Sequence, residues 1–289
     1  MDAPPTTEKN QAFIEVRALL ATIGIRVPDL LGQQLPDGFL LLEDLGDQLL
    51  LGQLNADTAD ACYQRALDML LILQTAGDLS QRVPAYSEQI LAEELSRFSE
   101  WFLEGLLGLN LAVQEVAIIQ AVAGQLIDSA LAQPQTLVHL DFHSRNLLVL
   151  PGGELATIDF QDARWGPLCY DLVSLLKDCY IRWPDSQLEA WALQYRARLQ
   201  ATGQFAGEDE AQFLRWFDWM GLQRHIKVLG NFSRLAIRDG KPGYLQDIPR
   251  VLDYIVPVLR RYAQFSQMLQ LLEDRVLSQV DSAIGGAGR

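Results

Sequence analysis

The chain has 289 residues, a hydrophobic fraction of 49% and a formal net charge of -14, so it is long enough to bury a sizeable core. The acidic charge opposes a phosphate backbone, and no basic run with interleaved aromatic residues occurs, which argues against a nucleic-acid partner. No apolar run approaches the ~18 residues of a membrane span, and the first ten residues lack the pattern of a signal peptide, so we expect a soluble, cytoplasmic protein with no membrane partner.

Three cysteines, Cys62, Cys169 and Cys179, are spaced neither as C-x-x-C nor in clusters with histidine. Such spacing is not typical of zinc or redox sites, and an odd number of cysteines does not suggest a disulfide framework. We therefore expect three small, buried side chains.

The first predicted element is a helix over residues 11–23, where apolar side chains recur every three or four positions. Two short extended runs, residues 27–35 and 38–44, follow it and meet at the turn Leu-Pro-Asp-Gly, which predicts a hairpin. Helical periodicity then covers residues 57–76, 87–106 and 111–132, and Pro134 ends the last of these helices. Helices resume near Tyr170 and continue to about residue 275, with interruptions at Pro- and Gly-containing segments.

A second hairpin is expected between these helical regions, from the apolar runs 147–150 and 155–160. Gly152 and Gly153 suit a two-residue turn, which needs a positive φ at both positions. That turn would place Asn146 directly opposite Asp159, with Cβ atoms roughly 4.5–5.5 Å apart. An amide oxygen and a carboxylate at this spacing can share one Mg²⁺ ion, which prefers oxygen ligands and completes its shell with water and substrate phosphates.

Asp141 lies five residues before Asn146, on the loop that enters the hairpin. It can face the same site without binding the metal, as a general base should. Phosphoryl transfer needs this combination, because metal ions neutralise phosphate oxygens while a separate carboxylate orients the attacking hydroxyl and accepts its proton. An isolated Asp-x4-Asn is common in loops, where both residues cap turns, so the hypothesis depends on the other motifs that accompany it.

The order H-x-D-x-x-x-x-N followed by I-D-F, which starts at His139, resembles the catalytic and metal-binding loops of the protein-kinase-like fold. The segment IDFQDA, in place of the DFG of protein kinases, is similar to the aminoglycoside phosphotransferase family. This resemblance implies an α+β, protein-kinase-like fold of two lobes with ATP as phosphoryl donor. Residues 1–46 would be a remnant of the N-terminal nucleotide-binding lobe, and residues 47–289 a large, mostly helical C-terminal lobe. In the family, the glycine-rich loop and the strand with its phosphate-binding lysine precede the first helix. Here only ten residues precede the predicted helix and no G-x-G-x-x-G occurs, so we expect the N-terminal lobe to be incomplete.

The resemblance also implies roles for individual residues. Asp141 would be the catalytic base, and Asn146 and Asp159 the Mg²⁺ ligands. The resemblance further assigns support of the catalytic loop to His139 and Asp171, and contact with adenine at the hinge to backbone groups of Glu43, Asp44 and Leu45. Arg145 is either a phosphate contact or a surface charge.

Several long segments resemble, within this family, the bacterial anomeric sugar kinases that phosphorylate N-acetylmuramate and N-acetylglucosamine at C1 in cell-wall recycling. One such segment, residues 219–250, carries polar side chains that would recognise hydroxyls or an acetamido group: Arg224, His225, Lys227, Asn231 and Arg234. A solvated helix face explains them equally well.

Two alternatives remain open. An acidic cleft would suit a polycation as well as a sugar, so an aminoglycoside, choline or another small alcohol stays open as acceptor. The chain can also be a truncated or degenerate kinase-fold protein that binds nucleotide and transfers phosphate poorly.

Overall fold

The computed structural model describes residues 1–4, 8–205 and 209–287. The chain forms two compact units, each described here by itself. Unit 1 comprises Met1–Ala85, Pro134–Asp178 and Pro184–Asp209, and unit 2 comprises Tyr86–Gln133, Cys179–Trp183 and Glu210–Arg289. Strands and helices are both present, which confirms the α+β class. The lobe boundary at residue 46 stays a prediction.

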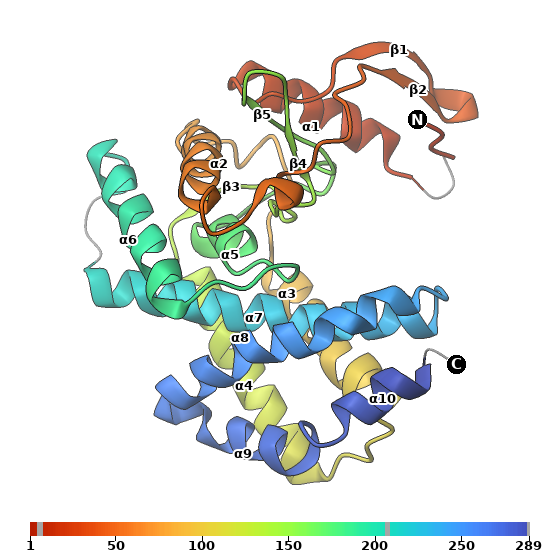
Figure 1. The fold of residues 1–289 in the computed structure, drawn as a ribbon, viewed down its shortest axis with the longest axis vertical. Helices are drawn as coiled ribbons and strands as arrows, with labels where there is room; N and C mark the ends of the chain where they lie inside the picture. Colours follow the sequence, from red (N-terminus) through yellow and green to blue (C-terminus); the bar gives the residue numbers. More distant parts are fainter. Residues whose placement is uncertain (5–7, 206–208, 288–289) are drawn as a thin grey trace. The chain divides into compact units, whose positions relative to one another are not determined.

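The N-terminal part of unit 1 contains helix α1 (Asn10–Thr22) and the antiparallel strands β1 (Leu30–Gln34) and β2 (Phe39–Leu42). Helix α1 lies beside the β1–β2 hairpin (Figure 1). Its predicted apolar stripe is buried at Phe13, Val16, Leu19 and Leu20. A short 3-10 helix, Leu35–Asp37, forms the turn, and Gly38 closes it with a φ of 76°. The predicted helix and hairpin are therefore confirmed.

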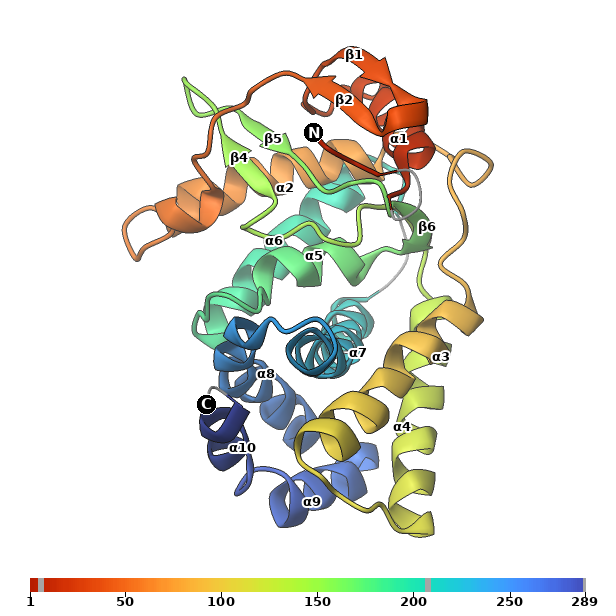
Figure 2. The same ribbon diagram turned by 90° about the vertical axis from the view of Figure 1, so that its right-hand side faces the viewer.

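The rest of unit 1 combines three helices with two pairs of short strands: α2 (Ala59–Gln74), α5 (Cys169–Leu176), α6 (Asp185–Ala201), β3 (Gln135–Val138), β4 (Leu147–Val149), β5 (Leu155–Thr157) and β6 (Arg164–Pro167), with a 3-10 helix at Leu50–Gln53. Strand β3 pairs with β6 and β4 with β5, both antiparallel. Helix α2 packs against α5, α6, β3 and β5 (Figure 2). The β3–β6 pair was not predicted, because four-residue strands carry too short a pattern to separate from loops.

The register of the β4–β5 hairpin differs by one residue from the predicted one. Leu147 pairs with Thr157 and Val149 with Leu155. The N–H of Leu150 donates to the carbonyl of Glu154 at 2.8 Å, so three residues rather than two form the loop. Asn146 therefore lies opposite Ile158, whose N–H donates to the Asn146 carbonyl at 3.0 Å, and the predicted pairing of Asn146 with Asp159 is wrong.

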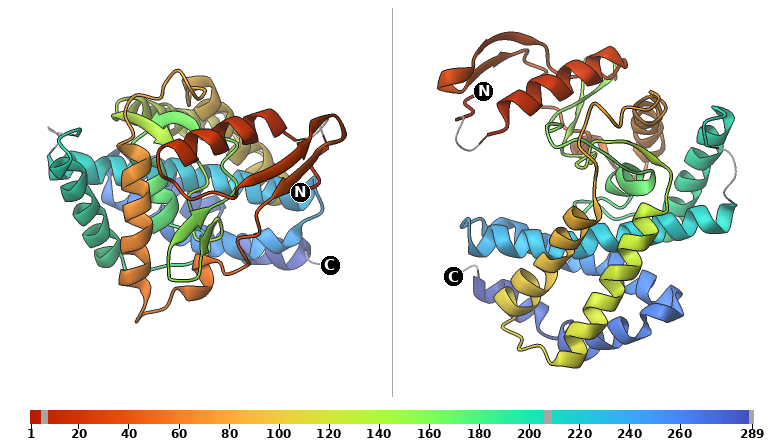
Figure 3. Two further views of the ribbon diagram at one scale, coloured as in Figure 1. Left: turned by 90° about the horizontal axis from the view of Figure 1, so that it is seen from above. Right: turned by 180° about the vertical axis from the view of Figure 1, so that it is seen from behind.

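Unit 2 is helical: α3 (Glu88–Arg97), α4 (Val113–Leu131), α7 (Glu210–Ile237), α8 (Ile248–Arg261), α9 (Ser266–Arg275) and α10 (Val280–Ala287), with a π-helix at Phe98–Leu106 and 3-10 helices at Pro242–Asp247 and Ala263–Phe265. Helix α7 packs against α3, α4 and α8 (Figure 3). It crosses α3 so closely that a Cβ atom added at Gly230 would lie 2.5 Å from the carbonyl carbon of Arg97. The helices predicted in this region are confirmed, and glycine is needed at the crossing.

Cys62, Cys169 and Cys179 are all free and buried, as predicted. Among the described residues, no helix combines the length and apolarity that a membrane crossing requires.

Candidate active site

A pocket of about 390 Å³ in unit 1 contains two of the predicted site residues, Asn146 and Asp159. The end of the β4–β5 hairpin also contributes Ile158, Phe160 and Gln161. The opposite lining comes from the N-terminal part of the chain: Met1, Glu8, Lys9, Asn10, Phe13, Pro28 and Leu42. The pocket lining is thus mixed, with apolar side chains beside three amide side chains, two carboxylates and Lys9.

Asp159 reaches Asn146 through an unusual backbone conformation. Its φ is 63°, a left-handed value that few residues other than glycine adopt. With this conformation, the amide nitrogen Nδ2 of Asn146 lies 3.5 Å from Oδ2 of Asp159, although the two residues are not cross-strand partners. Leu140, just before Asp141, has the only other positive φ among the described non-glycine residues, at 73°. Strained backbone of this kind often gathers at functional sites.

The donor atoms at Asn146 and Asp159 fit a magnesium ion. Nδ2 of Asn146 donates to the carbonyl of Asp141 at 3.0 Å, while no described residue donates a hydrogen bond to its Oδ1. Gln161 donates to Oδ1 of Asp159 at 2.8 Å, which leaves Oδ2 turned toward the amide. No group of three His, Cys, Asp or Glu side chains within the described residues could hold a metal. Two protein oxygens with water and phosphate oxygens match the coordination that Mg²⁺ prefers.

Asp141 belongs to a loop held by the neutral side chain of His139. The N–H of Asp141 donates to Nδ1 of His139 at 3.3 Å, and Nε2 of His139 lies 2.7 Å from the hydroxyl of Thr157. Since Nδ1 accepts, Nε2 carries the proton. His139 is 1% exposed, and burial lowers its pKa to about 4, against the attraction of Asp141. His139 therefore orients the loop without carrying charge near pH 7.

Asp171 holds the same loop from α5. Its two carboxylate oxygens accept the backbone N–H groups of His139 at 2.6 Å and Leu140 at 3.0 Å. Asp171 is fully buried, and the two bonds fix the chain where Leu140 takes its left-handed conformation. These two hydrogen bonds are the physical basis of the supporting role that the sequence predicts for Asp171.

A second buried acid near this loop was missed by the sequence analysis. Asp178 accepts hydrogen bonds from the backbone N–H of Ser144 at 3.0 Å and from its hydroxyl at 2.5 Å. Asp178 lies two residues beyond the end of α5 at Leu176, where helical periodicity no longer applies. Its seven-residue spacing from Asp171 therefore carried no signal of its position.

In the predicted hinge segment, Glu43 uses both its backbone N–H and its carboxylate in hydrogen bonds within the protein. The N–H of Glu43 donates to the carbonyl of Asp29 at 2.8 Å. Its carboxylate forms a two-bond ion pair with Arg26, at 2.9 and 2.5 Å, which lowers the pKa of Glu43. No described residue accepts a hydrogen bond from the backbone N–H of Asp44 or Leu45. Contact with adenine through these two residues stays a prediction.

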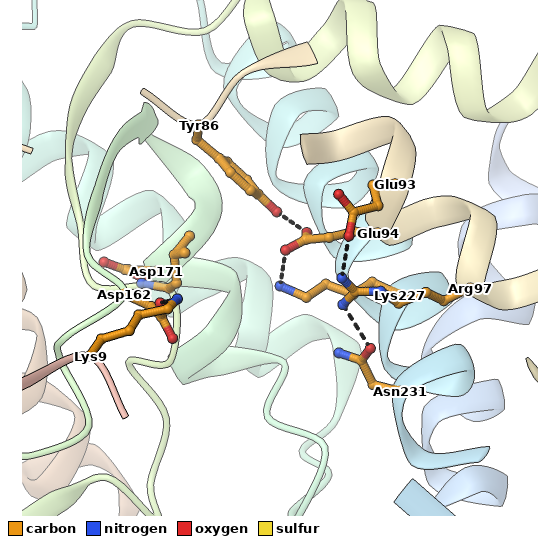
Figure 4. Close-up of polar contacts among 10 residues, drawn as sticks. Lys9, Tyr86, Glu93, Glu94, Arg97, Asp162, Asp171, Lys227 and Asn231 are labelled. Carbon is orange, nitrogen blue, oxygen red and sulfur yellow. Dashed lines mark hydrogen bonds and ion pairs between the residues drawn. The ribbon is translucent and has the colours of Figure 1, made fainter. Parts of the chain in front are cut away.

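Two cationic side chains of unit 1 have different surroundings. Arg145 is exposed and does not line the pocket described above, so neither of its two predicted roles is settled. Lys9 does line that pocket, and its Nζ lies 2.5 Å from Oδ1 of Asp162, in the IDFQDA segment (Figure 4). Both side chains are largely exposed, and exposed pairs contribute little to stability, so this ion pair holds Lys9 only weakly.

The predicted acceptor contacts all belong to α7 in unit 2. Arg224 and His225 are buried, at 4% and 1% exposure. The ring of His225 stacks on Tyr254 at 4.6 Å. Asn231 is half-buried, and its Oδ1 accepts a hydrogen bond from Arg97 at 3.1 Å. A solvated helix face does not describe these three positions, and contact with the acceptor stays a prediction for each.

Comparison with known proteins shows the family. The model of the phosphotransferase enzyme family matches residues 1–216. An N-acetylmuramate/N-acetylglucosamine kinase from Pseudomonas putida is 41% identical over 277 residues, 95% of this chain and 80% of that protein. The protein of the same name from Neisseria meningitidis is 36% identical over 96% of this chain and 83% of its own length.

Solved structures show the same fold at low sequence identity. A Plasmodium vivax ethanolamine kinase matches 87% of this chain and 74% of its own, with a TM-score of 0.65 and 14% identity. A choline kinase from Streptococcus pneumoniae matches 85% and 79%, with a TM-score of 0.59 and 14% identity. The predicted kinase-like fold is thereby confirmed, and the chain belongs to the phosphotransferase enzyme family.

Proposed function

We propose that the protein is an ATP-dependent kinase that phosphorylates a hydroxyl of an amino sugar, with N-acetylmuramate and N-acetylglucosamine as acceptors and C1 as the carbon modified. Family membership accounts for phosphoryl transfer to a hydroxyl, and the names of relatives at 36–41% identity support the choice of sugar. The proposed setting is cell-wall recycling in the cytoplasm.

The observation that carries this proposal is the clustering of Asp141, Asn146 and Asp159 in unit 1. The amide of Asn146 bonds the backbone of Asp141 and lies beside the carboxylate of Asp159. Three separate functional groups, a base and two oxygen ligands, are thus linked through one side chain. Phosphoryl transfer relies on such positioning more than on covalent chemistry by the protein.

In this proposal each residue of the site has one role in the phosphoryl transfer. The sugar hydroxyl oxygen attacks the γ-phosphorus, its proton passes to the carboxylate of Asp141, and the bond from the γ-phosphorus to the bridging oxygen breaks, so that ADP leaves with the electron pair. Asn146 and Asp159 would hold Mg²⁺, which neutralises charge on the phosphate oxygens. Asp171 and His139 keep Asp141 in place.

The test is ADP release by the purified chain with Mg²⁺ATP and either sugar. We expect sugar-dependent release that Asp141→Asn reduces by at least about a hundredfold, within the range known for general-base removal. Release that does not depend on sugar, or that persists in Asp141→Asn, contradicts the proposal. Binding of ATP with no transfer to either sugar would support the degenerate alternative, and transfer to choline or an aminoglycoside instead would replace the acceptor.

A further inference from the structure

The hydroxyl of Thr157 lies between the loop of Asp141 and the strand end at Asn146, all within unit 1. Thr157 is the last residue of β5 and is fully buried. Its Oγ1 lies 2.7 Å from Nε2 of His139 and 3.3 Å from the carbonyl oxygen of Asn146. Burial of a hydroxyl costs free energy unless the group is hydrogen-bonded, and this hydroxyl has a partner in both parts of the candidate site.

The hydrogen bonds at Thr157 run in one direction. A backbone N–H can only donate, so Nδ1 of His139 accepts from Asp141, and the proton of the neutral ring is on Nε2. Nε2–H then donates to Oγ1 of Thr157, whose own hydrogen donates to a carbonyl. The carbonyl of Asn146, at 3.3 Å, is nearer than that of Ile158, at 3.5 Å. This role needs an uncharged group that accepts and donates at once, as a hydroxyl does.

The backbone of Thr157 is held without the help of its side chain. Thr157 pairs with Leu147 across the hairpin, and its N–H donates to the carbonyl of Arg26 at 2.9 Å. The strand pairing therefore stays in place when the hydroxyl is removed. What is lost is the link from the ring of His139 to the carbonyl of Asn146.

We propose that Thr157 is a positioning residue for the phosphoryl transfer. Its hydroxyl joins the loop of the base Asp141, through the ring of His139, to the backbone of the metal ligand Asn146. The inference rests on the proposed function for the roles of base and ligand. The side-chain amide of Asn146 already bonds the carbonyl of Asp141, and the link through Thr157 adds a second connection, which restricts orientation as well as distance.

The test compares Thr157→Val and Thr157→Ser with the control Thr136→Val in the full-length chain. Valine keeps the branched shape and the strand preference of threonine without the hydroxyl, whereas serine keeps the hydroxyl. Thr136 is a matched control, because it is also buried in a strand of unit 1, and its hydroxyl donates to the carbonyl of Gln74 at 2.9 Å.

We expect Thr157→Val to lower kcat for either sugar by about tenfold to a hundredfold, the range that small misplacements of reacting groups produce. The KM for the sugar should stay within about twofold, because a fully buried hydroxyl does not touch the substrate. Thr157→Ser should recover most of the lost kcat, and Thr136→Val should keep it within about threefold. A loss of kcat that Thr136→Val shares, or that Thr157→Ser does not recover, would overturn the inference, because packing and not the hydroxyl would then be the cause.

Nuclear magnetic resonance of the histidine rings tests the hydrogen bonds without any transfer of phosphate. The chain has three histidines, and His139→Gln assigns the signals of that ring. We expect the proton on Nε2 and a ring-proton signal that moves in Thr157→Val and stays in place in Thr136→Val. A proton on Nδ1 would reverse the order of donors and overturn the inference, and so would a signal that Thr157→Val leaves unchanged.

Failure of the proposed function has a different signature. The unmodified chain would then transfer phosphate to neither sugar, whatever the ring signals show. In that case calorimetry of ADP binding with and without Mg²⁺ decides on Thr157. A weaker Mg²⁺-dependent affinity in Thr157→Val than in the unmodified chain supports the positioning of Asn146, and equal affinities overturn it.

Discussion

The amide of Asn146 and the carboxylate of Asp159 lie 3.5 Å apart although the hairpin pairs Asn146 with Ile158. The left-handed φ of Asp159 turns its side chain toward the neighbouring strand. Asp159 therefore lowers the stability of the fold through its backbone conformation. The same conformation places its carboxylate, the predicted metal ligand, beside Asn146.

Replacing Asp159 should separate stability from activity. Glycine adopts the left-handed conformation without penalty, whereas alanine does not, so Asp159→Gly should be more stable than Asp159→Ala by about 1 kcal/mol. Both variants should lose at least about a hundredfold in Mg²⁺-dependent transfer, since the carboxylate is gone. Urea unfolding and ADP release measure the two effects. If Asp159→Ala is as stable as Asp159→Gly, the backbone at this position is not strained.

Removing Asp171 should destabilise unit 1. Asp171→Ala leaves the buried N–H groups of His139 and Leu140 without acceptors, and the expected loss is about 2–5 kcal/mol in the free energy of unfolding. Asp171→Asn keeps one acceptor oxygen and should lose less. Asp68 provides a control, because it is an exposed acid of the same unit, paired with Arg198, and Asp68→Ala should cost no more than about 0.5 kcal/mol. Similar losses in Asp171→Ala and Asp68→Ala would contradict the supporting role.

Acid should destabilise the protein partly through His139. Its pKa in the folded state, about 4, lies below its ordinary value of 6.5, so the unfolded chain takes up a proton first as the pH falls. The stability that the neutral ring contributes is complete above pH 6.5 and is lost as the pH falls toward 4, by about 3 kcal/mol in all. His139→Gln cannot titrate, and its free energy of unfolding should fall less between pH 7 and 4.5. Parallel pH profiles for the two proteins would mean that the ring is not buried in its neutral form.

Two glycine substitutions test the packing of unit 2. Gly230→Ala places a methyl group against the backbone of Arg97, so α3 and α7 must move apart, at a cost of about 1–3 kcal/mol. Gly124 lies in α4 with no neighbouring atom within 4 Å of an added Cβ, and Gly124→Ala should stabilise by about 0.5–1 kcal/mol. Urea midpoints compare them directly. Stabilisation by both substitutions would show that the crossing is not as close as described.

Local patterns in the sequence predicted much of this fold. The apolar stripe of α1 and the long helices of unit 2 follow from periodicity, because burial of one helix face depends mainly on the order of residues along that helix. The family motifs likewise point to Asp141, Asn146 and Asp159 as site residues.

The remaining features depend on contacts that a linear pattern does not contain. Two consecutive glycines permit a two-residue or a three-residue loop, and a change of one residue reverses the faces of a strand. The predicted register at Asn146 failed for this reason. The crossing of α3 and α7 depends on the backbone of Arg97 meeting Gly230, more than a hundred residues later in the chain.

The stacking of Phe13 on Phe160, with ring centroids 4.9 Å apart, ties α1 to the segment that carries Asp159. Both rings are buried, at 7% and 0% exposure, so α1 cannot separate from this segment without exposing two aromatic faces to water. The amide hydrogens of α1 and of the hairpin should therefore exchange with solvent as one cooperative group. A ligand held by Asp159 would slow exchange in α1 as well, which gives a way to follow nucleotide binding from a helix that carries neither the base nor the metal ligands.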